Sequence, residues 1–554
     1  MNVPARHLPF NQKNAEKNVV SALLDARNTY GGKRQIMIDG DERVMTYDDI
    51  LRAAFALGSA IRKHTKRGEN VGVLLPTGVG AVITFFALHA YGRVPAMLNF
   101  TAGEKGLKAA CAAAEISVVL TAHKFVEIGK FEDLIEQMKS TVKFVYLEEV
   151  REKLSLVDKL HGAAGPIAPW LIQSRRGPSD VGVVLFTSGT EGEPKGVVLS
   201  HRNLLANVEQ VRSHIQLYDS DIVFNPLPTF HCFGLTVGSL MPLLLGLKAV
   251  QHPSPLQART IATRVRDTGA TILLSTDTFI SQYARAGDQG DLNSVRLAVC
   301  GAERVRDETR QLVRRKYNIE ILEGYGVTEA APVVAANQIG ANKLGTVGRL
   351  LSGMDYKLEP VEGIPDAGRL HIRGPNIMMG YLKSDKPGVL QPLPEGWHDT
   401  GDVVSVDPEG YIAIRGRVKR FAKIGGEMVS LAVVENCASA LWPDHMHAAV
   451  SVPDDRKGEQ ILLVTDAPQA NRGELIAWAR NHGVPELAVP RHIVHTEAVP
   501  VLGTGKTDYV RVKQLALEGD THKAPSLVQE VPLQQAAQTP RTEGQSDAAG
   551  PAAE

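Results

Sequence analysis

The distribution of apolar positions along the chain predicts an α/β protein. Short runs rich in β-branched residues alternate with longer stretches whose apolar residues recur every three or four positions; these runs include VGVLLP, SVVLTA, ATILLST and VRLAVCG. Strands that alternate with helices in this way are typical of parallel sheets flanked by helices. We therefore expect a large amino-terminal lobe of parallel-type sheets covered by helices.

The pattern changes twice in the second half of the chain. From about residue 345 the strand-like runs are shorter and separated by Gly and Pro, which predicts a small β-rich subdomain at about 345–417, completing an amino-terminal domain at 1–417. The runs AAVSV and ILLVTD, with the helical stretch GELIAWARNHG, predict a separate α+β domain at 418–524. Residues 525–554 are rich in Gln, Ala, Pro and small polar residues, so we expect a disordered tail.

One apolar stretch approaches the length of a membrane-spanning helix. It runs from Phe230 to Val250, close to the ~20 residues that a span requires. It also contains His231, Pro242 and Lys248, which disfavour a span. We expect a buried helix beside an apolar pocket. The amino terminus lacks the apolar core of a signal peptide.

Composition narrows the class of protein. The 554 residues are 44% hydrophobic, and 61 basic residues balance 61 acidic ones, which gives no overall electrostatic case for binding nucleic acid. The four cysteines are scattered, without the spacing of a metal site or a disulfide framework. We expect a cytoplasmic protein, with peripheral contact to the inner membrane left open.

A glycine-rich loop is the first candidate for chemistry. The stretch VGVVLFTSGTEGEPKGVVLSHRNLL indicates a strand, a loop, a second strand and a helix that begins after Ser200. Hydroxyls, backbone N–H groups and Lys195 in such a loop can surround phosphate oxygens. An ordinary turn is the alternative. The candidate phosphate ligands are Thr187, Ser188, Gly189, Thr190, Gly192 and Lys195.

A second glycine-rich stretch, PVLGTGKTDY, ends like a P-loop. A P-loop requires glycine where this chain has Pro500, and proline removes an N–H that a phosphate cradle uses. The stretch also lies too late in the chain for the remaining strands of a P-loop domain. Lys506 therefore needs another explanation.

Seven motifs, taken in order, supply that explanation. The stretch TSGTEGEPKG resembles the phosphate loop of the adenylate-forming (acyl-activating) enzymes, and NPLPTFHCFG, CGAE, EGYGVTEA, HDTGD, RGRVK and PVLGTGKTDY resemble further motifs of that family in the family's order. The resemblance covers roughly residues 20–520. It implies an enzyme that joins a carboxylic acid to ATP, releases pyrophosphate and passes the acyl group to a thiol.

The resemblance implies roles for particular residues. Because two anions must approach each other, catalysis has to rest on charge neutralisation and positioning. The implied catalytic residues are Lys506, Lys195, Thr328, Glu329 and His231, although His231 can equally be a core histidine. The implied ATP or AMP ligands are Thr187, Ser188, Gly189, Thr190, Gly192, Lys195, Gly301, Ala302, Glu303, Gly324, Tyr325, Gly326, Thr328, Asp402, Arg417 and Lys506.

The remaining implied roles concern metal, lid and acyl group. Glu329 and Thr190 are the expected ligands of Mg²⁺, which prefers one or two carboxylates together with phosphate oxygens. Lys506 would lie on a mobile carboxy-terminal lid with its hinge at Lys419. His231, Phe233 and Leu235 are the expected lining of the acyl pocket.

Two features bear on the thiol acceptor. Glu191 in the loop and the stretch KRFAKIGGEMVSLAVVE resemble the acyl-[acyl carrier protein] synthetase half of a bacterial acyltransferase/synthetase. The acyltransferase HxxxxD pattern occurs only at His214–Asp219, which we interpret as coincidence. We expect a long-chain fatty acid and acyl carrier protein as substrates; CoA is the alternative acceptor, and a homologue that only binds nucleotide is the alternative of another class.

A basic run near the hinge could contact an acidic carrier protein. It contains Arg415, Arg417, Lys419, Arg420 and Lys423. Charge complementarity of this kind favours docking. A solvated or ATP-facing hinge segment explains the same charges equally well.

Overall fold

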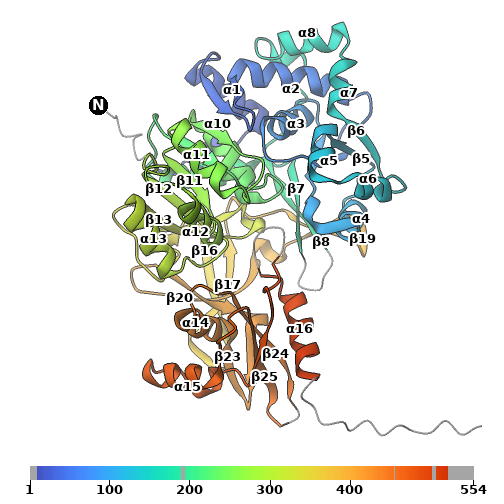
Figure 1. The fold of residues 1–554 in the computed structure, drawn as a ribbon. Coiled ribbons are helices and arrows are strands. Elements are labelled where there is room, and N and C mark those ends of the chain that lie inside the picture. The colour runs from blue at the N-terminus through green and yellow to red at the C-terminus, as the bar shows by residue number, and fades with distance from the viewer. Residues whose placement is uncertain (1–8, 189–193, 455, 502–506, 522–554) are drawn as a thin grey trace, which may run out of the picture.

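The computed structural model describes residues 9–188, 194–454, 456–501 and 507–521. The fold is α/β, as the alternating pattern predicts: a large amino-terminal domain of mixed sheets and helices is followed by a smaller carboxy-terminal domain (Figure 1). Among the described residues, no helix combines the length and the apolar character needed to span a membrane.

The first large sheet has nine strands and a parallel centre. Its six central strands run parallel, whereas the strands at both edges pair antiparallel. In spatial order the strands are β15 (Arg349–Leu350), β14 (Val333–Ala336), β13 (Glu320–Gly326), β12 (Leu297–Cys300), β11 (Ile272–Ser275), β9 (Ile222–Asn225), β10 (Lys248–Gln251), β1 (Gln35–Ile38) and β2 (Val44–Thr46).

The second large sheet has eight strands and carries the glycine-rich loop. Five of them pair parallel, and an antiparallel extension follows β7. In spatial order they are β19 (Lys386–Pro392), β18 (Gly380–Lys383), β8 (Pro194–Ser200), β7 (Val181–Ser188), β4 (Val94–Met97), β3 (Asn70–Val73), β5 (Val118–Thr121) and β6 (Lys143–Tyr146).

Helices cover these sheets. In chain order they are α1 (Val19–Tyr30), α2 (Tyr47–Ile61), α3 (Val79–Ala90), α4 (Gly103–Ala113), α5 (His123–Gly129), α6 (Glu132–Met138), α7 (Leu147–Glu152), α8 (Leu156–Ala164), α9 (His201–His214), α10 (Met241–Leu245), α11 (Ala258–Thr268), α12 (Asp277–Ala286) and α13 (Asp307–Tyr317). Short helical segments join them: η1 (Gln12–Ala15), η2 (Phe100–Ala102), η3 (Pro169–Leu171), η4 (Phe233–Leu240), η5 (Thr328–Ala330) and η6 (Pro394–Gly396).

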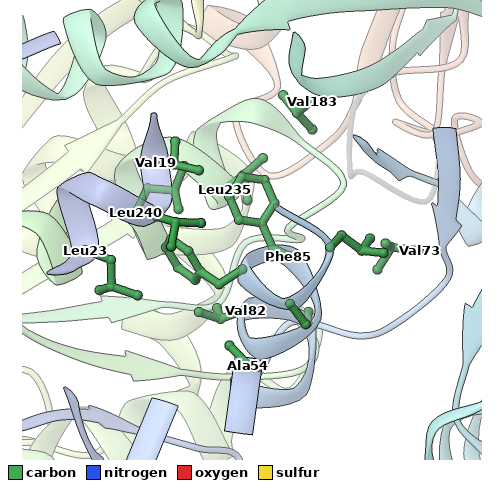
Figure 2. Close-up of a cluster of buried hydrophobic side chains, with 14 of the residues drawn as sticks. Val19, Leu23, Ala54, Val73, Val82, Phe85, Val183, Leu235 and Leu240 are labelled. Carbon is green, nitrogen blue, oxygen red and sulfur yellow. The ribbon is translucent and has the colours of Figure 1, made fainter. Parts of the chain in front are cut away.

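The largest core cluster lies around α3. Phe85 and Val82 of α3 pack with Val19 and Leu23 of α1 and with residues of η4 (Figure 2). Helix α9 is buried along nearly its whole length because it contacts strands of both large sheets. Ser200 begins α9, as predicted: its hydroxyl accepts from the Asn203 N–H, and the Asn203 side chain accepts from the Ser200 N–H.

The chain from residue 345 to 417 does not form one sheet. Its first strand, β15, joins the nine-stranded sheet, while β18 and β19 extend the eight-stranded sheet. The rest forms a four-stranded antiparallel sheet, β16 (Asp355–Val361), β17 (Ile364–Arg373), β20 (His398–Val406) and β21 (Ile412–Arg417). Gly and Pro separate these strands along the chain, but strand spacing carries no information about which sheet each strand joins.

A five-stranded sheet follows η7 (Val418–Arg420). It contains β23 (Glu427–Ser430), β22 (Phe421–Ile424), β25 (Gly458–Thr465), β24 (His447–Asp454) and β26 (His492–His495). The accompanying helices are α14 (Leu431–Leu441), α15 (Arg472–Asn481), η8 (Glu486–Ala488) and α16 (Tyr509–Thr521). This unit has its own apolar core around Val434 and Leu463.

Candidate active site

The glycine-rich stretch lies between two paired strands. Strands β7 and β8 pair antiparallel, with Thr187 opposite Lys195, so both lie where the strands enter the loop. Both side chains are half-buried. Ser188 ends β7 and pairs with Pro194. The remaining predicted phosphate ligands, Gly189, Thr190 and Gly192, lie outside the described residues, as does Glu191.

Three chain segments converge on Glu329, which lies in η5 immediately after β13. Tyr381 of β18 donates its hydroxyl to Glu329 Oε1 at 2.7 Å. Lys195 Nζ lies 5.9 Å from the centre of the Tyr381 ring. Burial and the Glu329 carboxylate raise the pKa of Tyr381, so its hydroxyl remains a donor. Tyr381 thereby links the predicted metal ligand to the predicted phosphate-binding lysine.

Tyr381 was missed in the sequence because no motif marks it. Strand β18 lies almost two hundred residues beyond β8, yet it pairs with β8 and sets Tyr381 opposite Val197. The Met378 N–H also donates to the Glu329 carbonyl at 2.8 Å, which fixes η5 against the start of this segment. The contact follows from sheet pairing, which a single sequence does not reveal.

A second polar cluster surrounds Asp402. This carboxylate is buried on β20 and accepts two side-chain bonds: the Tyr325 hydroxyl donates to Oδ2, and Arg417 Nε donates to Oδ1 at 2.8 Å. Asp402 and Arg417 are direct partners in the β20–β21 pairing. Burial and the neighbouring Asp402 charge raise the pKa of Tyr325 well above its usual value. The structure thus brings together the three residues expected at the ribose and adenine.

The segment after β12 carries three predicted nucleotide ligands. Ala302 has φ +69°, a left-handed conformation that glycine adopts more easily than alanine. The Glu303 carboxylate accepts from the N–H and hydroxyl of Thr278, at 3.1 and 3.0 Å, so it caps the first turn of α12. Gly301 lies beside Phe233.

The end of β13 supplies the next group of predicted ligands. A Cβ at Gly326 would lie 2.5 Å from the Pro332 carbonyl oxygen, so the close approach of this strand to the returning chain requires glycine. Gly324 lies two residues earlier on the same strand, and Thr328 begins η5 with a half-buried side chain.

An apolar cavity adjoins these residues; its empty space, including the part open to solvent, measures about 860 Å³. One wall is a face of the nine-stranded sheet, and the others come from α9 with the residues after it and from η4 with α10. One end is formed by predicted nucleotide ligands, namely Gly301, Ala302, Gly324, Tyr325 and Gly326. The apolar walls include Val211, Ile215, Leu217, Phe233, Val237, Met241, Ile272, Leu274, Leu297 and Val299.

Within the stretch from Phe230 to Val250, η4 and α10 form a buried helical segment beside this pocket, as predicted, and the last residues belong to strand β10. Phe233 lines the cavity together with Val237 and Met241, four and eight residues later on the same face. Leu235, also expected in the pocket, points elsewhere: it packs in the core with Phe85 (Figure 2). The helical period explains the difference, because side chains two residues apart on a helix point to different sides.

His231 lies next to this segment but outside the cavity lining. Its ring packs against Phe230, with 4.6 Å between ring centres, and its carbonyl accepts from the Leu235 N–H at 3.0 Å. His214, which belongs to the HxxxxD pattern, is a buried histidine whose Nε2 lies 2.7 Å from the Ala336 carbonyl oxygen. That position is structural, in agreement with the interpretation as coincidence.

Some basic side chains of the hinge region are bonded within the protein and so are not free for docking. Arg420 is mostly buried: its guanidinium lies 3.6 Å from the centre of the Tyr509 ring and donates to Glu435 at 2.6 Å. Arg417 is bonded to Asp402. Arg417 and Arg420, two residues of the basic run, are therefore engaged in internal ion pairs. Lys419 lies in η7, at the start of the carboxy-terminal unit, and Lys506 lies outside the described residues.

The donor set around Glu329 fits Mg²⁺ held chiefly by phosphate oxygens. The described residues contain no cluster of three or more His, Cys, Asp or Glu side chains that could hold a metal alone. A single carboxylate steadied by Tyr381 suits Mg²⁺, which keeps several waters and takes one or two carboxylates besides phosphates.

Comparisons with known proteins show the family of this chain. The family model for AMP-binding enzymes matches residues 24–382, more than half of the chain. A feruloyl-CoA synthase from Amycolatopsis sp is 28% identical over 476 residues, covering 83% of this chain and 92% of its own. A long-chain-fatty-acid–CoA ligase from Bacillus subtilis (strain 168) is 27% identical over 549 residues, covering 91% and 95%.

Solved structures show the same fold. The o-succinylbenzoate CoA synthetase from Bacillus subtilis, in complex with ATP and magnesium ion, superposes with a TM-score of 0.75 at 18% identity. The match covers 89% of this chain and 99% of that one. The chain therefore spans nearly the whole architecture of these proteins.

Proposed function

Since the chain belongs to the family of AMP-binding enzymes, we propose that it is an ATP-dependent acid–thiol ligase that converts a long-chain fatty acid into its CoA thioester. The observation that carries the proposal is the apolar cavity, one end of which is formed by the residues expected at the nucleotide. An acid bound there would extend its chain along the sheet and present its carboxylate beside Tyr325.

The shape of the cavity favours an aliphatic chain. Leu297, Val299 and Gly301 follow one another on the same face of β12 and the loop after it, a distance of about 13 Å at the usual rise of a strand. Aliphatic side chains line most of that length, and they lack the polar groups that would orient a substituted aromatic acid.

The first half-reaction would form an acyl-adenylate. A carboxylate oxygen of the acid attacks the α-phosphorus of ATP, the bond to the pyrophosphate oxygen breaks, and pyrophosphate leaves. Asp402 would accept from the ribose hydroxyls in place of its bonds to Tyr325 and Arg417, and Tyr325 would face adenine. Lys195 and the loop hydroxyls would offset the phosphate charge, and Thr328 would donate to the α-phosphate.

Metal and lid would complete this step. Bound Mg²⁺ would neutralise phosphate charge, held by Glu329 and by Thr190 of the loop. Lys506, on the lid at residues 418–524, would bridge the carboxylate and the α-phosphate. Rotation about Lys419 would then admit the thiol, whose sulfur attacks the acyl carbonyl as AMP leaves.

Acyl carrier protein is the second candidate acceptor. Glu191 and the stretch from Lys419 to Glu435 favour it, because they resemble an acyl-[acyl carrier protein] synthetase. The names of the relatives favour CoA. The internal bonds of Arg420 weaken the argument for a basic docking face.

Parallel reactions separate the acceptors. Purified protein with ATP, Mg²⁺ and a long-chain fatty acid receives either CoA or holo-acyl carrier protein, and AMP and thioester are measured. Thioester with CoA supports the proposal, and thioester only with carrier protein assigns the second candidate. Absence of AMP release with a panel of short, long and aromatic acids would overturn both.

A further inference from the structure

Helix α8 packs against the protein through its polar and small residues. Asp158 is fully buried, accepting from the Ser59 hydroxyl at 2.8 Å and from Lys63 Nζ at 2.6 Å. His161 Nδ1 lies 2.9 Å from the Tyr91 hydroxyl. A Cβ at Gly162 would lie 2.8 Å from the Arg52 carbonyl oxygen, so glycine allows α8 to approach α2 closely. These positions, at helical spacing, form one face.

The opposite face of α8 is apolar and points into solvent. This arrangement reverses the usual one, in which the apolar stripe of a surface helix faces the core. Apolar exposure continues in the turns after the helix, where the Ile167 N–H donates to Ala164 and the Leu171 N–H to Ala168. The six side chains, between 53% and 75% exposed, form what we call the α8 patch: Leu156, Val157, Leu160, Ile167, Trp170 and Leu171.

Cations accompany the α8 patch in the sequence. Between Leu154 and Ser179 the sequence carries Lys159, Arg175 and Arg176. The one carboxylate in that stretch, Asp158, is buried and neutralised by Lys63. Exposed apolar side chains gathered in one stretch of chain mark interaction sites. Here the same stretch carries cations, and the exposed Glu152 of α7 lies just before it.

We propose that the α8 patch docks the enzyme onto a membrane surface that contains anionic lipids. Leu, Ile and Trp side chains of a short helix enter the boundary between headgroups and acyl chains, where the indole of Trp170 is favoured, and lysine and arginine remain among the headgroups. With only nine residues, α8 lies in the interface and does not span it.

The position of α8 supports this orientation. In Figure 1, α8 (teal) is the outermost element at the far end of the amino-terminal domain, opposite the carboxy-terminal unit that contains α14, α15 and α16. A protein docked through this end keeps the carboxy-terminal unit away from the bilayer.

Vesicle flotation of the full-length protein tests the proposal, and its readout is independent of catalysis. Vesicles of phosphatidylcholine mixed with phosphatidylglycerol are compared with phosphatidylcholine alone. The triple variant Leu160→Ser/Trp170→Ser/Leu171→Ser should bind the mixed vesicles at least about tenfold more weakly than wild type. Ile128→Ser is the matched control, since Ile128 of α5 is 72% exposed outside the patch.

Charge is tested separately. Lys159→Glu/Arg175→Glu should weaken binding to the mixed vesicles and leave binding to pure phosphatidylcholine unchanged, and added salt should reproduce that loss. Thermal unfolding confirms that each variant is folded.

Two results would overturn the proposal. The first is wild-type protein that stays unbound with both kinds of vesicle, or a triple variant that floats like wild type. The second is light scattering that shows a wild-type dimer converted to monomer by the triple variant, which would assign the α8 patch to contact with a second copy of the chain.

Discussion

The two ends of the candidate nucleotide site are built in different ways. At the ribose end, both oxygens of Asp402 are bonded, to Tyr325 and to its strand partner Arg417. At the phosphate end, Glu329 is reached by Tyr381 from a distant strand, and Tyr381 in turn lies beneath Lys195. The ribose end thus includes a bond between direct strand partners, whereas at the phosphate end Glu329 and Tyr381 lie on segments that are not paired with each other.

The largest expected effect lies at the phosphate end. Lys506→Ala should lower the rate of adenylation by about 10²–10³-fold, because the proposed mechanism uses the positive charge of Lys506 to offset the developing phosphate charge. Thioester formation from a preformed acyl-adenylate should largely survive. Both half-reactions are measured separately by rapid quench, and an equal loss of both would remove Lys506 from the adenylation step.

At the ribose end, Asp402→Ala should weaken ATP binding by on the order of 10²-fold, since two charge-assisted hydrogen bonds to the sugar disappear. Calorimetric titration with ATP measures the effect. Asp407→Ala is the matched control: Asp407 follows the same strand but pairs with Lys343 at 2.7 Å at the surface. Equal affinities of the wild type and the Asp402 variant would show that the ribose binds elsewhere.

The link between Glu329 and Lys195 can be broken without removing either charge. Tyr381→Phe should raise the Mg²⁺ concentration needed for half-maximal adenylation by about three- to tenfold, because Glu329 loses a hydrogen bond of about 1.5–3 kcal/mol that orients it. Mn²⁺ binding in the presence of ATP, followed by electron paramagnetic resonance, gives a readout apart from turnover. Tyr356→Phe, in β16, is the control.

An unchanged Mn²⁺ affinity in the Tyr381 variant would limit Tyr381 to packing.

The apolar cavity adjoins the ribose end, and a larger side chain on one wall would shorten the space for an acyl chain. Val299→Phe, on the face of β12 that lines the cavity, should lower kcat/KM for long-chain acids by about tenfold while leaving short-chain acids almost unaffected. A chain-length series measures the ratio, and the short acids serve as internal control. Equal losses at every chain length would place the acyl chain outside the cavity.

The smallest effect concerns Ala302, whose φ of +69° is strained for any residue with a Cβ. Ala302→Gly should raise the free energy of unfolding by no more than about 1 kcal/mol, and Ala302→Val should lower it by about 1–2 kcal/mol. Denaturant titration of both variants measures the sign of the change in the free energy of unfolding. A more stable Val variant would contradict the assigned conformation.

Local pattern predicts much of this molecule and fails where tertiary contacts decide. The alternation of strands and helices gives the fold class, and Ser200 begins α9 as its residue type implies. The buried segment after Phe230 was predictable because His231, Pro242 and Lys248 interrupt the apolar run and disfavour a membrane span. Each of these conclusions depends on residues close together in the chain.

Other features depend on contacts that spacing does not encode. Arg420 looks like part of a basic surface until Glu435 and Tyr509 are found beside it. Tyr381 enters the site only because β18 pairs with β8.

The most direct measurement is fatty-acid-dependent exchange of labelled pyrophosphate into ATP, performed without any thiol. We expect exchange that requires Mg²⁺ and a long-chain acid and that falls by at least about tenfold in Asp402→Ala at subsaturating ATP. No exchange with any acid, in protein that binds ATP, would contradict adenylate formation as the activity of this site.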